Sequence, residues 1–295
     1  MKLLIIVNPQ SGTKKGVQQL DKLLPYFNSN NIKTEVIHTK YHKHATDITA
    51  SYNFSDINAV IGVGGDGTFH EVVTGLMKRK DSQQLPIGII PGGSGNSFLY
   101  ETNDINPISI FKKILLFKKR RVDILEIKTV DTILYSINLV GWGLVTDIGE
   151  KAEKYRWLGP SRYTLVSLIE IIKNKNRSAT LTIENEKNTN QFTFIIACNT
   201  KYVGKGMYMA PKASTNDGLL DLIVVKGNLS RWRLFKTLPK LFKGTHLRDP
   251  NITYHQISNF SIETKEKDLL NIDGELKGTT PISVKVIPNA IEILN

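Results

Sequence analysis

The feature that most constrains how this chain can fold is a short apolar run that ends in a cluster of glycines. The stretch "AVIGVGGDGTFHEVVTGL" spans residues 59–76, and its first part, residues 59–63, has the length and composition of a buried strand. A helix-like pattern begins near residues 68–69. Between them lie Gly64, Gly65, Asp66, Gly67 and Thr68. Glycines here would let backbone N–H groups face an anion. The N-terminus of the following helix would add the positive end of the helix dipole.

Two further loops follow apolar runs in the same way. After residues 85–91 the chain continues with Gly92, Gly93, Ser94, Gly95 and Asn96, and after residues 2–8 it continues through Ser11, Gly12 and Gly16, with Asn8 closing the run. None of the three matches the P-loop or the dinucleotide G-x-G-x-x-G pattern. Loops that follow parallel strands meet at one edge of the sheet. The sequence therefore predicts a site for a phosphate-bearing ligand at that edge.

The acid in the first loop does not suit a simple anion site. Asp66 would repel a phosphate, so its presence favours a role in handling a metal or in accepting a proton from an attacking hydroxyl. The alternative is a tight strand-to-helix turn in which Asp66 caps the helix.

The first 120 residues alternate between strand-like and helix-like segments. Strands are expected at residues 2–8, 33–39, 59–63 and 85–91, and helices at residues 17–30 and 68–79. This alternation predicts a parallel sheet with crossover helices, and strands that are apolar throughout suit a sheet covered on both faces.

After residue 121 the pattern changes to a series of strands, several with alternating polarity, and the run at residues 133–143 is expected to form one of them. Helical segments are expected near residues 150–175 and 230–243. We predict an α/β domain at residues 1–122 and a mainly antiparallel β-sandwich domain at residues 123–282. The last strand, about residues 283–295, could return to the first domain. On an extended strand the acids at 273 and 275 would face the same way. The alternative, which the residues by themselves favour, is an exposed turn at Gly274.

Composition narrows the class of protein. The formal net charge is +12, which favours anionic partners such as a nucleotide or an acidic membrane face. No uncharged run is long enough to span a bilayer, and no signal peptide is recognised. The single cysteine, Cys198, lies in an apolar run and is expected to be buried and inert. These features predict a cytoplasmic protein. No nucleic-acid-binding module is recognisable.

Several motifs together resemble a known family. "VNPQSG", "GGDGTFHEVVTGL" and "PGGSGNSF" are similar, in this order and spacing, to the diacylglycerol kinase catalytic fold shared by bacterial lipid kinases, sphingosine kinases and ceramide kinases. The resemblance continues through "GWGLVTDIGEKAEKYRWLGPSRYTL", "NDGLLDLIVV" and "NIDGEL". The "GGDGT" motif alone is also found in NAD kinases and phosphofructokinases.

The resemblance implies transfer of the γ-phosphoryl group of ATP to a lipid hydroxyl in the presence of Mg²⁺. It also implies which residues would bind the nucleotide: Asn8, Thr39, the loops at 64–68 and 92–96, Glu153, Arg156 and Arg162. Asp66 matches the general base of sphingosine kinases. Asp273 matches an acid that organises Mg²⁺, and Glu275 is the alternative base. Asp217 matches a structural metal ligand of some bacterial members, although an Asp-Gly turn explains it equally well.

One position departs from the sphingosine kinase pattern. Gly149 stands where sphingosine kinases have a second acid that holds the sphingoid amino group, while Asp147 is retained. This departure leaves diacylglycerol, a sphingoid base or a related lipid as the acceptor.

Two basic, apolar stretches bear on membrane contact. We expect the stretch at residues 109–117 to pack on the core, whereas at residues 231–243 packing and contact with an anionic membrane are equally favoured. Peripheral membrane association is therefore predicted. The sequence is compatible with both a monomer and a homodimer. The competing interpretations are a NAD kinase and a non-catalytic lipid- or nucleotide-binding protein on the same fold.

Overall fold

The chain folds into two compact units in the computed structural model, which describes residues 1–11, 15–92, 97–101, 106–154, 166, 169–173, 176–204 and 206–294. Unit 1 comprises Met1–Ile124 and Pro288–Asn295, and unit 2 comprises Leu125–Ile287. The boundary predicted at residues 122/123 falls inside strand β5 (Lys119–Lys128), which begins in unit 1 and ends in unit 2.

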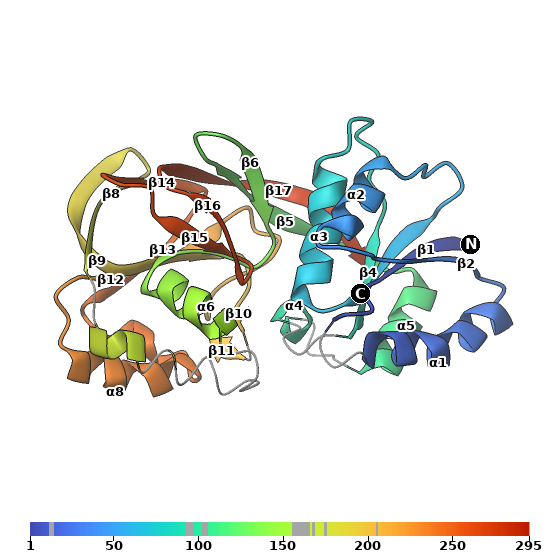
Figure 1. The fold of residues 1–295 in the computed structure, drawn as a ribbon, viewed down its shortest axis with the longest axis horizontal. Coiled ribbons are helices and arrows are strands. Elements are labelled where there is room, and N and C mark those ends of the chain that lie inside the picture. The colour runs from blue at the N-terminus through green and yellow to red at the C-terminus, as the bar shows by residue number, and fades with distance from the viewer. Residues whose placement is uncertain are drawn as a thin grey trace. The chain divides into compact units, whose positions relative to one another are not determined.

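Unit 1 is built on a parallel sheet (Figure 1). Its strand order is β2 (Lys33–His38), β1 (Lys2–Val7), β3 (Ala59–Gly64), β4 (Ile87–Pro91) and the end of β17 (Ile282–Leu294). Each neighbouring pair is parallel. Strands β3 and β4 are buried along their whole length, which explains why their residues are apolar without alternation.

Helices cover both faces of this sheet (Figure 1). The helices are α1 (Lys15–Ser29), α2 (His44–Ser51), α3 (Asp66–Met77), α4 (Ser97–Tyr100) and α5 (Pro107–Leu116). Helices α1 and α5 pack together on one face, and α2 and α3 pack together on the other. Helix α1 buries Leu20, Leu23 and Phe27, whose spacing places them on one helical stripe.

Unit 2 is an antiparallel β unit. Its strands are the end of β5, β6 (Ile133–Ser136), β7 (Leu139–Gly143), β8 (Arg177–Ile183), β9 (Glu186–Cys198), β12 (Leu220–Lys226), β13 (Ile252–Ile257), β14 (Asn259–Thr264), β15 (Leu269–Ile272), β16 (Glu275–Thr279) and the start of β17. A separate ribbon is formed by β10 (Tyr202–Val203) and β11 (Met207–Tyr208). The predicted fold class, a parallel α/β part followed by a mainly antiparallel β part, is confirmed.

Unit 2 has two hydrophobic clusters. One lies among the strands and includes Trp142, Leu181 and Phe260. The other includes Cys198, which is buried as expected, and lies beneath helices α6 (Leu144–Lys154) and α8 (Arg231–Leu241). A 3₁₀ turn, η2 (Thr245–Arg248), follows α8. No helix in the described ranges is both long enough and apolar enough to cross a membrane.

Two elements differ from the expectations. The run at residues 133–143, expected as one strand, is interrupted at Ile137–Asn138, because the N–H groups of both residues donate to the carboxylate of Asp273. Helix α6 begins at Leu144, earlier than the helix expected near residues 150–175. Residues 155–165 of that predicted helix lie outside the described residues.

Candidate functional site

The glycine loop after β3 is shorter than its sequence indicates. Strand β3 continues to Gly64, whose carbonyl accepts a hydrogen bond from the N–H of Gly92 (2.8 Å). Helix α3 begins at Asp66 rather than near residues 68–69, so only Gly65 separates strand from helix and Gly67 lies in the first helical turn. The expected loop is therefore mostly strand end and helix start, because pairing with β4 extends the strand.

Three glycines from different connections meet at this edge of the sheet. A Cβ atom built on Gly92 would lie 2.7 Å from the Cα of Gly16 and 3.3 Å from the Cα of Gly64. A Cβ on Gly64 would lie 2.3 Å from the Oγ1 of Thr68. No side chain fits at such distances, so part of the glycine content is explained by close approach of neighbouring loops to one another. These glycines also leave backbone without side chains at the carboxyl ends of the strands, which is where ligands bind in parallel sheets.

Asn8 connects the end of β1 to helix α3. Its Nδ2 donates to the Oγ1 of the buried Thr68 (3.1 Å), and its backbone N–H donates to the carbonyl of Val63 (3.0 Å). At the next strand, the N–H of Thr39 donates to the carbonyl of Val7 (2.8 Å). The predicted nucleotide-binding residues of the described part of unit 1 thus lie along one edge of the sheet.

Asp66 is the first residue of α3 and is half-buried. Its Oδ1 accepts a long hydrogen bond from the backbone N–H of Phe98 (3.4 Å), which lies in α4 just after the second glycine loop. A negative charge is favoured at a helix N-terminus because the unpaired N–H groups and the helix dipole point at it. Gly93, Ser94 and Asn96 of the second loop lie outside the described residues.

In unit 2, the carboxylate of Asp273 is surrounded by donors. Its Oδ1 accepts from the hydroxyl of Ser136 (2.6 Å) and from the N–H groups of Asn138 and Leu139 (2.9 Å each), and its Oδ2 accepts from the N–H of Ile137 (3.0 Å). The side chain is buried. This arrangement holds the connection between β6 and β7.

Residues 273–275 form a tight hairpin turn, the alternative to the extended strand. Asp273 and Gly274 have φ angles of 53° and 89°, and Ile272 pairs with Glu275 across the turn. Positive φ at both central residues is the geometry of a two-residue hairpin, for which Asp-Gly is a favoured sequence. Glu275 therefore does not share a strand face with Asp273. Its half-buried carboxylate pairs with the Nζ of Lys277 (3.0 Å).

Helix α6 carries the segment where the sequence departs from sphingosine kinases. A Cβ atom on Gly149 would lie 2.8 Å from the Nδ2 of Asn271, so an amide of β15 occupies the space beside this glycine. The retained acid, Asp147, forms an ion pair with the Nη2 of Arg177 (2.8 Å). The side chain of Glu153, and Arg156 and Arg162 altogether, lie outside the described residues.

Asp217 lies in a turn on the surface of unit 2. Its side chain is exposed, and its Oδ1 accepts the N–H of Leu219 (3.0 Å), two residues further on. Within the described ranges, no three His, Cys, Asp or Glu side chains gather closely enough to hold a metal ion. The metal roles of Asp217 and Asp273 stay predictions.

A buried acid that the sequence analysis did not single out lies four residues further on. Asp221 in β12 is fully buried, and its Oδ1 accepts a short hydrogen bond from the hydroxyl of Tyr254 in β13. Burial raises the pKa of Asp221 to about 6, and burial together with Asp221 raises the pKa of Tyr254. The signal was present in the sequence, since Asp221 is the acid within the apolar run "LLDLIVV".

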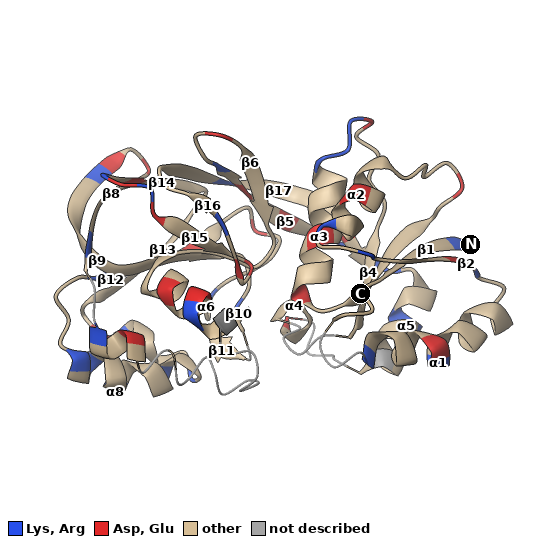
Figure 2. Ribbon diagram, viewed as in Figure 1, with Lys and Arg blue, Asp and Glu red and all other residues tan. Residues whose placement is uncertain are grey.

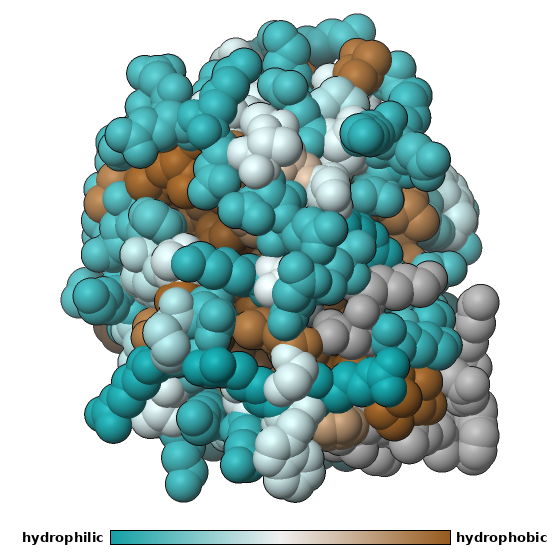
Figure 3. Space-filling model, turned by 90° about the vertical axis from the view of Figure 1, so that its left-hand side faces the viewer, coloured by the Kyte–Doolittle hydropathy of each residue, from teal (hydrophilic) through white to brown (hydrophobic). Residues whose placement is uncertain are grey.

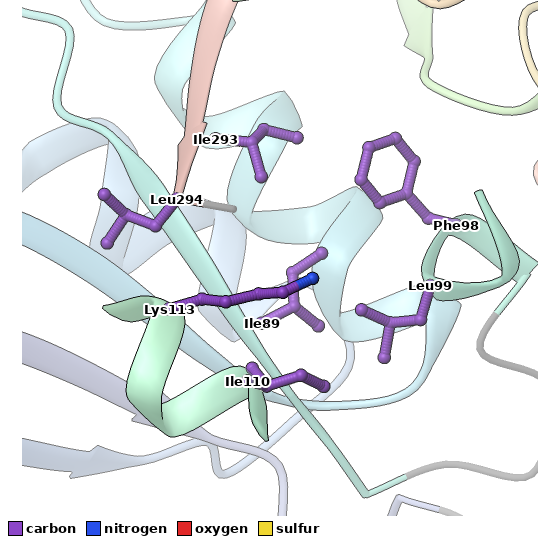
Figure 4. A pocket seen from close by; sticks show the side chains of 7 residues that line it. All are labelled: Ile89, Phe98, Leu99, Ile110, Lys113, Ile293 and Leu294. Atoms are coloured by element: carbon purple, nitrogen blue, oxygen red, sulfur yellow. The ribbon is translucent and has the colours of Figure 1, made fainter. Parts of the chain in front are cut away.

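Two hollows lie in the described part of the chain, one in each unit. The first lies in unit 1, has a volume of about 10 Å³ and is lined by Ile89, Phe98, Leu99, Ile110, Lys113, Ile293 and Leu294 (Figure 4). It has room for about one water molecule. The second, of about 490 Å³, lies in unit 2 among β8, β9, β12 and β13. Neither is lined by a residue predicted for the site.

The parallel α/β unit with its glycine-rich edge, followed by an antiparallel β unit, is the fold shared by diacylglycerol kinases and NAD kinases. The model of the diacylglycerol kinase catalytic domain matches residues 2–127, and that of the YegS C-terminal NAD kinase beta sandwich-like domain matches residues 138–295. The chain belongs to the diacylglycerol kinase catalytic-domain family, a family of lipid kinases, and carries the YegS-type C-terminal domain.

Individual proteins are similar to this chain in sequence or in fold. Sphingosine kinase 1 of Arabidopsis thaliana is 28% identical over 93% of this chain and 68% of its own length. A crystal structure of a diacylglycerol kinase from Bacillus anthracis is similar in fold, with a TM-score of 0.79, 23% identity and coverage of 99% of this chain and 96% of that chain. The structure of an NAD kinase from Archaeoglobus fulgidus in complex with ATP has a TM-score of 0.56 and 11% identity, and the match covers 100% of this chain and 94% of that chain.

Proposed function

We propose that this protein is an ATP-dependent lipid kinase that transfers the γ-phosphoryl group to the hydroxyl of a lipid. The observation that carries the proposal is the position of Asp66 at the start of α3, beside the junction of Gly16, Gly64 and Gly92. Bare backbone and a helix N-terminus suit the phosphates of ATP, and an acid next to them suits the attacking hydroxyl.

In the proposed reaction, the lipid hydroxyl loses its proton to the carboxylate of Asp66 as its oxygen bonds to the γ-phosphorus. The bond to the β,γ-bridging oxygen breaks, and ADP leaves. Phosphoryl transfer depends mainly on positioning and charge neutralisation. The hydrogen bond from Asn8 to Thr68 fixes the first turn of α3, and so fixes Asp66 relative to the strand ends. Arg156 and Arg162 are proposed to neutralise phosphate charge.

Mg²⁺ bound with ATP would neutralise charge on the β- and γ-phosphates. In kinases it is held by one or two carboxylates together with the phosphates. Glu275 fits this requirement, because its half-buried carboxylate has one basic partner, Lys277, in the described part of the chain. Asp273 fits less well, because it already accepts four hydrogen bonds. We therefore assign Asp273 the task of positioning the 136–139 turn.

We propose further that the acceptor carries a neutral headgroup, as diacylglycerol does. A cationic amine would need an unpaired acid, yet Asp147 is paired with Arg177 and the space beside Gly149 is filled by the uncharged amide of Asn271. The lipid is taken to be presented by an anionic membrane, which suits the net charge of +12.

The test is a panel assay with labelled ATP and Mg²⁺ on diacylglycerol, sphingosine, ceramide and NAD. We expect product from diacylglycerol. Asp66→Asn should lower kcat by about 10²–10⁴-fold, the usual contribution of a general base, and leave ATP binding within a few fold. Glu275→Gln tests the alternative base. No labelled product from any lipid would overturn the kinase proposal, and product from NAD alone would assign a NAD kinase.

The acceptor class has its own test. Gly149→Asp combined with Asn271→Ala places an acid in the space that the amide now fills. If the headgroup site lies here, the ratio of kcat/KM for sphingosine to that for diacylglycerol should rise about tenfold or more, equivalent to about 1.4 kcal/mol of transition-state discrimination. An unchanged ratio would show that this position does not select the headgroup.

A further inference from the structure

Helix α8 presents two different faces. Its inward face carries Leu234, Phe235, Leu238 and Leu241, which pack on the second hydrophobic cluster of unit 2. The outward face carries Trp232, Lys236 and Lys240, which are exposed and spaced four residues apart, so they form one stripe along the helix. Core packing is thus confirmed for most of the apolar residues of this stretch, but it does not account for the outward face.

Two aromatic side chains stand out from the rest of the helix. Trp232 is 68% exposed, and Phe242, at the C-terminal end of α8, is 54% exposed. The Nζ of Lys236 lies 5.2 Å from the centre of the Trp232 ring. Aromatic rings beside lysines at a surface are typical of segments that lie at a membrane–water interface, because the ring enters the headgroup layer while the amine meets lipid phosphate.

The charge of this region is one-sided. Residues 226–250 contain seven Lys or Arg residues and one acid, Asp249. Asp249 pairs with Arg233 (2.9 Å). Arg231, Lys236, Lys240, Lys243 and Arg248 are exposed, and the described part of the chain offers none of them an acidic partner within ion-pair distance. Figure 2 shows the basic positions on α8 in blue.

The surrounding surface does not suit a large protein partner. On the side that Figure 3 views, hydrophobic side chains lie in several patches divided by hydrophilic ones. Protein-docking surfaces usually present a contiguous apolar patch. A second copy of this chain would bring the same positive charge to the face and be repelled. Charge complementarity instead favours a polyanionic surface into which single rings can insert.

We propose that the outward face of α8, formed by Trp232, Lys236, Lys240 and Lys243, docks on an anionic lipid bilayer. The helix lies in the plane of the interface, its amines contact lipid phosphates, and the ring of Trp232 enters the headgroup layer. Because the inward face is already anchored on the core, docking requires no folding of the helix. The proposal deepens the lipid-kinase proposal and rests on it for the presence of a membrane substrate.

Vesicle binding without ATP tests the docking separately from catalysis. The full chain is sedimented with vesicles of phosphatidylcholine containing about one third phosphatidylglycerol, and with pure phosphatidylcholine. We expect binding to the anionic vesicles only, weakened by salt. The variant with Lys236→Gln, Lys240→Gln and Lys243→Gln should bind roughly 100-fold more weakly, from about 1 kcal/mol for each basic residue at the surface. Trp232→Ser alone should weaken binding about tenfold.

Helix α5 supplies a matched control. It and its flank carry exposed Lys112, Lys118 and Arg121 beside Leu116, which is 76% exposed. Replacing these three basic residues with Gln changes the net charge by the same amount in unit 1. This control should bind vesicles within about twofold of the wild type. All substituted side chains are exposed, so thermal unfolding of each variant should match that of the parent.

Fluorescence locates the contact. The difference between wild-type and Trp232→Phe emission should shift to shorter wavelength on adding anionic vesicles. The docking proposal is overturned if the α5 control loses binding as much as the α8 variant, or if Trp232 shows no shift. It is also overturned if the α8 variant loses affinity for a DNA duplex but not for vesicles. A chain inactive on every lipid that still docks through α8 would overturn only the kinase proposal.

Discussion

Asp273 shows how a single side chain can hold a connection between strands far away in the sequence. It accepts four hydrogen bonds from residues 136–139, three of them from backbone N–H groups in a buried region. We expect Asp273→Ala to lower the free energy of unfolding by about 3 kcal/mol or more, because each buried donor left without an acceptor costs about 1–3 kcal/mol. Urea unfolding followed by circular dichroism measures the loss.

Asp217→Ala is the matched control for this change, because Asp217 is also followed by glycine but is exposed. We expect it to cost less than about 1 kcal/mol. Equal losses for the two variants would show that the cluster around Asp273 contributes no more than a surface turn does.

The buried acid at position 221 should make stability depend on pH. The unfolded carboxyl releases its proton near its ordinary pKa of 3.8, whereas burial raises the folded pKa to about 6. Between these values the folded state binds more protons than the unfolded state, so stability should fall as the pH rises, by at most 1.36 kcal/mol per pH unit from this group. We expect Asp221→Asn to remove this fall, as measured by urea unfolding at pH 4, 5, 6 and 7. If the free energies of unfolding of the variant and the wild type differ by the same amount at every pH, the pH dependence does not come from Asp221.

At the scale of elements, helix α2 depends on a side chain from α3. Lys43 at its N-cap position provides no side-chain hydrogen bond, but the Oε1 and Oε2 of Glu71 accept from the N–H groups of Lys43 (3.0 Å) and Ala45 (3.1 Å). We expect Glu71→Ala to weaken α2 locally by about 1–2 kcal/mol, the usual cost of losing a helix cap. Hydrogen exchange should then quicken in residues 44–51 and not in β1. Glu71→Gln, which keeps one oxygen, should have a smaller effect, and uniform loss of protection would contradict the local role.

The elements of unit 1 also show what the sequence can predict. Apolar runs located β1 and β3 closely, because a strand covered on both faces needs apolar residues throughout. Strand β2, which is only partly buried, was located by its β-branched residues instead. Helix α2 was not predicted, since its cap comes from Glu71 rather than from its own sequence. The turn at Asp273 and Gly274 has a local signal, the Asp-Gly pair, and it is the alternative that the residues by themselves favour. The break at 137–138 depends on Asp273, a contact between distant parts of the chain that no local pattern contains.

In the candidate site, too, some features could be predicted from the sequence and others could not. Asn8, Gly64 and Gly92 were found from their positions after strands, because parallel strands deliver their ends to one edge. The close contact of Gly92 with Gly16 could not be found in this way, since it depends on how two connections pack against each other.

At the scale of the whole molecule, the two ends of the chain are folded into one unit. Residues 288–294 of β17 complete the parallel sheet of unit 1, where Ile293 pairs with Ile87 of β4. The N–H of Asn289 donates to the buried Asp123 (2.7 Å), and Ile291 and Ile293 are 1% and 2% exposed. Unit 1 therefore includes residues that are synthesised after all of unit 2.

A chain that ends after Ile287 should consequently lose the fold of unit 1. Removing one buried isoleucine side chain costs about 2–5 kcal/mol, and the deletion removes both Ile291 and Ile293 together with a strand edge. This loss is comparable to the whole stability of a typical domain, about 5–15 kcal/mol. Limited proteolysis should cut residues 1–124 rapidly in the truncated chain, whereas a chain ending after Ile293 should resist like the full protein. Resistance of the shorter chain would show that β1, β3 and β4 with their helices fold without the returning strand.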